Sequence, residues 1–271
     1  MLKDITLGQF FPGRSLLHRT DARIKIILLA VFLVFVLCAK SAAAFTFVAV
    51  CTAVLVIISA IPLKTIIKSL KPLMFVLIFT AVINLFFANG EDILLQWKFI
   101  KIYREGIENA IKMVVRLTCL VTGTSVLLTY TTSPLDLTDG IERLLTPLKH
   151  IGVPVHDFAM MMSIALRFIP TLIEETDKII SAQKARGADF ESGNLFSRAK
   201  ALIPILVPLF VSAYRRAFEL AEAMECRCYR SGVGKTRMKV IKTRPADYIF
   251  LGISVVCCVG IFFLNQVVIP F

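Results

Sequence analysis

Two arginines in similar surroundings are the side chains of this sequence best suited to bind a partner molecule. Arg186 lies in the segment Ala182–Gly187, and Arg227 lies 41 positions later in the segment Ala223–Cys228. A guanidinium is always charged and presents a planar fork of N–H donors, so it pairs well with carboxylates of another protein. Both segments are predicted to end helices, where the dipole favours a cation. The duplication favours two similar partners or one dimeric partner, although each arginine can also cap its own helix.

Other reactive groups in the sequence lack the companions that catalysis or metal binding needs. An acidic cluster at 174–177 has the spacing of a solvated helix face. Cys226 and Cys228 lack the further ligands of a zinc site, and the three histidines form no such pattern. The tripeptide 234–236 resembles the end of a phosphate-binding loop, but Tyr229 stands where that motif needs its first glycine. We therefore expect no catalytic residue, no cofactor and no metal, in a chain that is not itself an enzyme.

The composition is that of a membrane protein. Of the 271 residues, 57% are hydrophobic and only 18% are charged, and a water-soluble core of this size could not enclose so much apolar side chain. A bilayer is spanned by a helix of about twenty apolar residues. Five apolar runs are predicted as transmembrane helices: 24–39, 42–61, 72–88, 107–131 and 248–268. The net charge of +12 gives no reason to expect nucleic acid, because no basic face on a soluble domain accompanies it.

The basic residues predict how the chain crosses the membrane. Of the 31 Lys and Arg residues, 25 fall in the N-terminal tail, in the loop 64–71 and in the segment 133–245. Loops rich in Lys and Arg stay in the cytoplasm. We therefore expect a cytoplasmic N-terminus and an external C-terminus. The predicted domains are a membrane domain with four transmembrane helices at 1–132, a cytoplasmic domain at 133–245, and the last transmembrane helix at 246–271.

The segment 133–245 changes from uniformly apolar runs to amphipathic helices separated by Pro and Gly. Ser133–Pro134 predicts the start of the first helix, which ends near Gly152. The second helix follows Pro154 and stops at Gly187, and the third runs from near Leu195 to about Cys228. The predicted fold class is all-α: a polytopic membrane protein with about five transmembrane helices and a cytoplasmic block of long amphipathic helices.

Two charged residues fall at membrane depth in the fourth apolar run. Lys112 and Arg116 follow Glu108 at intervals of four, so the three side chains share one face of the predicted helix. One interpretation is structural, with Glu108 pairing Lys112 while the long side chains extend towards water. The other is a self-contained secondary transporter or channel, with Lys112 and Arg116 lining its path.

Several segments, spread over nearly the whole chain, resemble one known family. They are Leu17–Lys25, Thr131–Pro134, Ser163–Pro170, Ala182–Phe190 and Ala223–Tyr229. In these segments the chain resembles the transmembrane T component of energy-coupling factor (ECF) transporters, the EcfT and CbiQ family. The two arginine segments are the most specific part of the resemblance.

The resemblance implies a transmembrane coupling subunit of an ABC-type importer in the bacterial cell membrane. Two ABC-type ATPase subunits would hydrolyse ATP, and a small membrane-embedded S component would capture the substrate, commonly a vitamin or other micronutrient. The segment 133–245 would then hold coupling helices that dock on the ATPases. The implied contact residues are Ala185, Arg186, Gly187, Cys226, Arg227 and Cys228. Cys228 stands where the family usually has Gly, which leaves open a different ending for that helix.

Overall fold

In the residues that it describes, the structure, a computed structural model, is mainly helical and contains one short β-hairpin. It describes residues 11, 13, 15–87, 93–97, 100–188, 190, 194, 196, 200–230 and 243–266. The chain forms two compact units: one comprises residues 8–140 and 240–271, and the other contains residues 141–239. The tripeptide 234–236 lies outside the described residues.

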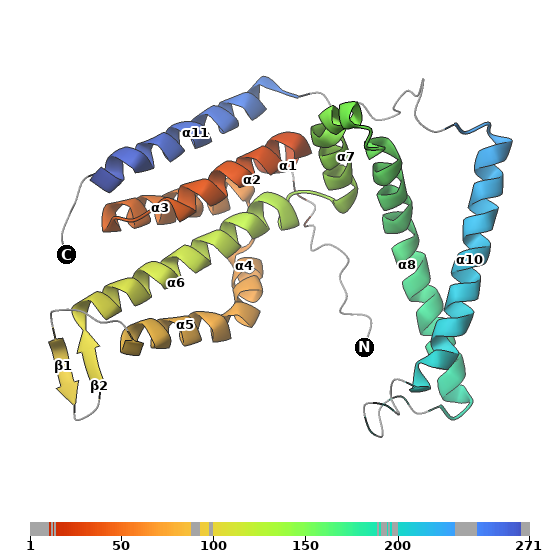
Figure 1. The fold of residues 1–271 in the computed structure, drawn as a ribbon, viewed down its shortest axis with the longest axis horizontal. Helices are drawn as coiled ribbons and strands as arrows, with labels where there is room; N and C mark the ends of the chain where they lie inside the picture. The colour runs from red at the N-terminus through yellow and green to blue at the C-terminus, as the bar shows by residue number, and fades with distance from the viewer. Residues whose placement is uncertain are drawn as a thin grey trace. The chain divides into compact units, whose positions relative to one another are not determined.

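The first unit is a bundle of apolar helices. Its elements are α1 (Leu16–Arg19), α2 (Ala22–Leu37), α3 (Ala42–Ser59), α4 (Leu63–Leu70), α5 (Met74–Phe87), β1 (Ile93–Trp97), β2 (Ile100–Tyr103), α6 (Arg104–Thr124) and α11 (Pro245–Gln266). Helix α6 contacts α2, α3 and α5, and α11 packs against α2 and α3. Figure 1 shows α2, α3, α6 and α11 running nearly parallel, as expected for helices that cross one membrane.

Four of the five predicted spans match helices that are long and apolar enough to cross a membrane. These candidates are Ala42–Ser59, Leu63–Phe86, Arg104–Tyr130 and Pro245–Gln266. The first predicted span forms α2, which has only 16 residues. The fifth candidate is Val155–Ala185, which the sequence places in the cytoplasmic segment. The prediction of a helical protein with about five potential membrane spans is therefore confirmed, but length and composition select a different fifth helix.

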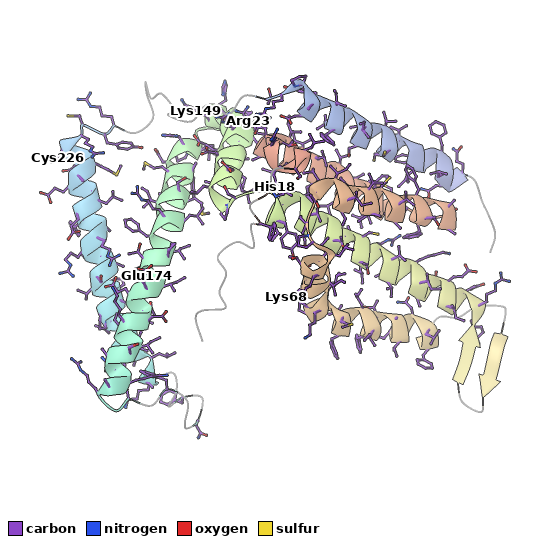
Figure 2. The ribbon with its side chains drawn as sticks, turned by 180° about the vertical axis from the view of Figure 1, so that it is seen from behind. His18, Arg23, Lys68, Lys149, Glu174 and Cys226 are labelled. Carbon is purple, nitrogen blue, oxygen red and sulfur yellow. The ribbon has the colours of Figure 1, made fainter. Side chains whose placement is uncertain are left out.

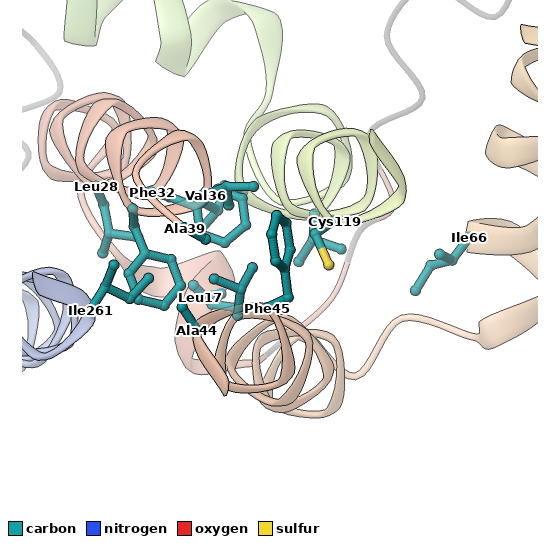
Figure 3. Close-up of a cluster of buried hydrophobic side chains, with 14 of the residues drawn as sticks. Leu17, Leu28, Phe32, Val36, Ala39, Ala44, Phe45, Ile66, Cys119 and Ile261 are labelled. Atoms are coloured by element: carbon teal, nitrogen blue, oxygen red, sulfur yellow. The ribbon is translucent and has the colours of Figure 1, made fainter. Parts of the chain in front are cut away.

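The core of this unit is made by aromatic and branched side chains of α2, α3 and α6. Figure 3 shows Phe32 and Val36 of α2, Phe45 of α3 and Cys119 of α6 turned into one cluster. Gly123 allows α6 to approach α2, because a Cβ at this position would overlap the Phe32 ring. The helices pack this closely because small residues at their contacts leave room for the rings.

The turn between α2 and α3 is closed by side chains from two other helices. Asn265 of α11 donates from Nδ2 to the carbonyl of Cys38 at 2.8 Å, and its Oδ1 accepts from the backbone N–H groups of Lys40 and Ser41 at 3.0 and 3.3 Å. Arg116 donates to the carbonyl of Ala39 at 2.7 Å. These bonds satisfy backbone groups that cannot rely on water if the turn lies near hydrocarbon.

The second unit is built on two long helices. Helix α7 (Pro134–Leu145) leads into it, continues as a 3₁₀ turn (Thr146–Ile151), and is followed by α8 (Val155–Ala185) and α10 (Ile203–Cys226). The predicted start of α7 is confirmed: Asp136 N donates to Ser133 Oγ at 3.1 Å, and that hydroxyl donates to the Asp136 carboxylate at 2.7 Å. Helix α10 begins later than the predicted Leu195, with Pro204 in its first turn.

Two local structures differ from the predictions. Residues 64–71, expected as a loop, form α4, and the segment expected as an outer loop contains the antiparallel pair β1–β2. Helix α4 forms because Ile66 is buried in the bundle core, a tertiary contact that no local pattern reveals.

A methyl group at Gly123 should destabilise the bundle. In the Gly123→Ala variant the new Cβ collides with the Phe32 ring, so we expect a loss of about 1–3 kcal/mol of stability. The matched control is Gly252→Ala in α11, where an added Cβ meets nothing within 4 Å. Thermal unfolding of the detergent-purified protein should show a lower midpoint for Gly123→Ala alone. Equal midpoints for the two variants would contradict this packing.

Candidate functional site at two helix ends

The helices α8 and α10 end with the same hydrogen-bond pattern. At the end of α8, Gly187 N donates to the carbonyl of Lys184 and Ala188 N donates to that of Gln183, both at 3.0 Å. At the end of α10, Cys228 N donates to the Glu225 carbonyl at 2.8 Å, and the following amide donates five residues back at 3.0 Å. This pair of bonds is the Schellman ending of a helix. The similarity of the two sequences is therefore also a similarity of backbone structure.

The residue that reverses the chain is Gly187 in one ending and Cys228 in the other. Their φ angles are 85° and 54°, both in the left-handed region. The different ending that Cys228 left open is not adopted. A side chain in this region costs about 1–2 kcal/mol, so the capping bonds of α10 must offset that cost.

Arg186 and Arg227 occupy the same position in these endings, immediately before the left-handed residue. Each is the C-cap of its helix and each is exposed. Among the residues that the structure describes, neither guanidinium lies within 4.0 Å of a carboxylate. Both positive charges are thus available at helix ends that already carry partial negative charge, and a carboxylate from another chain could reach them.

The two helix ends point in opposite directions. Helices α8 and α10 run antiparallel, since Glu175 contacts Arg216 and Met160 contacts Tyr229. Figure 1 shows the two helices crossing nearer the end of α8 and separating towards the end of α10. Arg227 therefore lies at about the level of Met162, some 24 residues of helix from Arg186, or roughly 36 Å at the helical rise.

Three contacts fix this antiparallel arrangement. Arg216 donates to the Glu175 carboxylate at 2.6 Å. A groove of about 250 Å³ between the helices is lined by apolar side chains: Ile164, Phe168, Leu172, Ala217, Leu220 and Met224. At the open end, the Tyr229 hydroxyl donates to the Met160 sulfur at 2.7 Å. The ion pair places Glu175, one of the acids in the cluster at 174–177, in a structural role.

A buried lysine holds the start of α7 to the membrane bundle. Lys25 of α2 is 2% exposed, and its Nζ donates to the Thr131 carbonyl at 2.7 Å and to Thr132 Oγ1 at 3.1 Å. The carboxylates of Asp136, Asp247 and Asp21 interact electrostatically with it. These acids belong to the first turns of α7 and α11 and to the N-cap of α2. Sequence reasoning counted Lys25 only as a basic residue of the N-terminal tail.

Gly140 also lets α7 lie close to α2. A Cβ at this position would lie 2.9 Å from the Ala22 Cβ, so no larger residue fits without a shift. The helix that leads from the bundle towards α8 is therefore joined to α2 by close packing as well as by charge.

The charged residues in α6 have structural partners. Lys112 contacts Glu108 at 3.2 Å, and the Arg116 guanidinium lies 5.1 Å above the centre of the Phe45 ring. Lys112 and Glu108 edge a pocket of about 540 Å³ between α3 and α6 whose other lining is mostly apolar. Lys112 thus makes the pair with Glu108 that the structural interpretation predicts. The structural interpretation of Lys112 and Arg116 is therefore favoured.

No group of three or more His, Cys, Asp or Glu side chains that could hold a metal ion occurs in the described parts of the chain. Cys226 and Cys228 are both exposed beside Arg227, and Figure 2 places Cys226 at the far end of α10. His156 contacts Glu142 at 2.9 Å, which ties the start of α8 to the end of α7.

Comparison with known proteins places this arrangement in a family. The CbiQ family, described as "Cobalt transport protein", matches residues 13–240. The chain is 51% identical to the "Energy-coupling factor transporter transmembrane protein EcfT" of Ruminiclostridium cellulolyticum, over 98% of this chain and 99% of the relative. It is 52% identical to the protein of the same name from Clostridium kluyveri, over 96% of this chain and 97% of the relative. The Bacillus subtilis protein of that name is 41% identical over 98% of this chain and all of the relative.

The fold and the sequence thus define a multi-pass membrane component of a transporter. The chain belongs to the CbiQ and EcfT family of ECF transporter transmembrane proteins.

Glycine at position 228 should stabilise the end of α10. The Cys228→Gly variant removes the cost of a left-handed side chain, so we expect about 1 kcal/mol of added protection in the last turn. Cys226→Gly is the matched control, because the same replacement inside the helix should destabilise it by up to about 1 kcal/mol. Amide hydrogen exchange of the last turn measures both. If amide exchange in the last turn is no slower in Cys228→Gly than in the wild type, Cys228 is not strained.

Removal of the Lys25 charge should weaken the junction of α2, α7 and α11. The Lys25→Met variant leaves the buried Thr131 carbonyl and Thr132 hydroxyl without their donor and removes a positive charge near Asp21 and Asp247, at an expected cost of about 1–3 kcal/mol. Arg23→Met is the control, because Arg23 lies 3.9 Å from Asp21, is partly exposed, and should cost about 1 kcal/mol or less. Thermal unfolding in detergent compares the variants. A Lys25→Met protein as stable as Arg23→Met would exclude this role.

Proposed function

We propose that this chain is the coupling subunit of an ATP-driven ECF importer of a vitamin or other micronutrient. In this proposal the helix ends at Arg186 and Arg227 each bind one of two ABC-type ATPase subunits, and the membrane unit and apolar helix faces hold a small S component that captures the substrate. The chain itself hydrolyses no ATP. The observation that carries the proposal is the pair of identical helix endings, each with an exposed arginine and no carboxylate partner among the described residues.

The geometry of the two endings supports binding to a pair of similar subunits. A dimer of ATPases presents the same acceptor surface twice, and an antiparallel helix pair presents the same ending twice, at separated points. An exposed arginine at a helix C-terminus meets a carboxylate with charge-assisted hydrogen bonds. Movement of the ATPases during their cycle would then displace the two ends of one helix pair, which transmits the motion as a rigid lever.

Exposed apolar side chains support a further protein partner. Along α10, Phe210, Tyr214 and Phe218 form a row in which the first pair of rings is stacked at 6.3 Å and the second meets edge to face at 4.8 Å between centres, and all three are exposed. Phe158 and Met161 of α8 are exposed as well. Exposed apolar surface of this extent usually marks a site that binds protein or membrane. An S component, itself a membrane protein, has the apolar surface to cover it.

The proposed orientation places the N-terminus and the domain 133–245 in the cytoplasm of a bacterial cell, where ATPase subunits are found. It follows from the distribution of Lys and Arg over the loops.

The alternative function is that of a self-contained secondary transporter or channel. Its candidate path residues, Lys112 and Arg116, are held by Glu108, Phe45 and the turn between α2 and α3.

Replacement of both arginines tests the proposal. In the Arg186→Ala and Arg227→Ala double variant each helix end loses its cation, and loss of a buried charge pair at an interface costs about 2–5 kcal/mol. We therefore expect the ATPase subunits to be lost from the complex purified in mild detergent, and uptake to fall at least about tenfold. Each single variant should lose part of the binding.

Arg215→Ala is the charge-matched control, because Arg215 is exposed in the middle of α10 and away from either ending. It should leave assembly and uptake unchanged. A double variant that assembles with both ATPases and transports normally would refute the role of the two arginines. Transport by the chain alone, without any ATPase, would favour the secondary transporter.

A further inference from the structure

Helix α4 lies across the direction of the helices that span the membrane. Figures 1 and 2 both show α4 turned away from the run of α5 and α6, and Lys68 marks it in the second view. The turn between α4 and α5 is the 3₁₀ segment Lys71–Leu73, which contains Pro72. In a bilayer crossed by α5 and α6, a helix in this direction lies along the membrane surface. The stretch Leu63–Phe86 is therefore not one continuous span, although its length and composition allow it.

The side chains of α4 separate into three faces. Ile66 is 5% exposed and packs into the core of the bundle. Leu63 and Ile67 are 66% and 67% exposed, so they face away from the bundle. Lys64, Lys68 and Lys71 are exposed next to them and fall within an arc of about 60° on a helical projection. A helix with adjacent apolar and basic exposed faces has the pattern of an interfacial helix.

The three lysines are exposed charges. None lies within 4.0 Å of a carboxylate of the residues that the structure describes. Three uncompensated charges on adjacent turns repel one another, so a clustered anion would stabilise the face. With Leu63 and Ile67 in the acyl region, the neighbouring lysines reach the level of the phosphates.

We propose that α4 is an in-plane helix whose lysines Lys64, Lys68 and Lys71 bind the phosphate groups of anionic phospholipids. The apolar side chains Leu63 and Ile67 anchor it in the outer part of the acyl layer. In the orientation given under the proposed function, these lipids belong to the cytoplasmic leaflet, which carries a negative surface potential. An acidic protein surface is the other class of partner that could meet this face. Exposed leucine and isoleucine beside the lysines favour the lipid.

The bundle fixes this lipid-binding face in place. The Tyr130 hydroxyl donates to the Thr65 carbonyl at 3.5 Å, and Tyr130 is itself 1% exposed. Tyr130 immediately precedes Thr131 and Thr132, which hold Lys25. The bound lipids would therefore lie next to the point where α6 passes into α7.

The test compares lipid preference in nanodiscs made with phosphatidylcholine and phosphatidylglycerol. The purified full chain is released into native mass spectrometry, and the retained lipids are counted. The wild type should prefer phosphatidylglycerol. The Lys64→Gln, Lys68→Gln and Lys71→Gln triple variant should lose that preference by about tenfold or more, because each lysine near an anionic surface contributes about a fivefold factor.

Two controls keep this result interpretable. Lys40→Gln makes the same change in the turn between α2 and α3, at the other end of these helices, and should keep the preference. The triple replacement by Arg keeps the charges and should also keep it, which separates lipid binding from misfolding. Unchanged preference in the Gln triple variant would overturn the proposal. A separate purification of the whole complex in mild detergent would then show whether the Gln triple variant loses the ATPase subunits, the result expected if α4 contacts protein. The nanodisc measurement uses no ATPase, so its outcome is independent of the two arginines.

Discussion

The buried contact between Lys25 and the corner where α6 passes into α7 is the interaction on which the arrangement depends. Its ammonium satisfies the Thr131 carbonyl and the Thr132 hydroxyl, and it offsets carboxylates at the starts of three elements. A buried ammonium holds its acceptors in one geometry because any displacement leaves the charge without its hydrogen bonds in a low-dielectric environment. Helix α7 begins at this corner, so its first turn is held to the bundle.

Charged side chains have different surroundings inside the helix packing and at the helix ends. In helix α6 of the membrane bundle, Arg116 donates to a backbone carbonyl and Lys112 pairs with Glu108. In α8 and α10, the helix pair is closed by Arg216 and Glu175, while the arginines at the helix ends stay exposed. The exposed arginines at the helix ends, which have no carboxylate within 4.0 Å among the described residues, are suited to binding partners.

The sequence predicts what depends on local chemistry. Ser133 with Asp136 starts α7, and Gly187 ends α8, because caps and left-handed closures are formed by neighbouring residues. It does not predict the partners of Lys25, which lie 106 and 107 positions away, nor α4, which needs the core contact of Ile66. At position 228 the usual preference for glycine gives way to the capping bonds of the helix end. The role of Arg186 and Arg227 rests on the family resemblance and stays a proposal.

The most direct measurement of that role uses the two thiols beside Arg227. Of the seven cysteines, all within the described residues, Cys226 and Cys228 alone are exposed. A thiol-reactive photo-crosslinker can therefore be attached next to Arg227 in the native sequence and activated in membranes that contain the assembled transporter. The account predicts a covalent adduct between this chain and an ATPase subunit, which is lost in the Cys226→Ser and Cys228→Ser double variant. Adducts with lipid alone, or with no ATPase subunit, would contradict it.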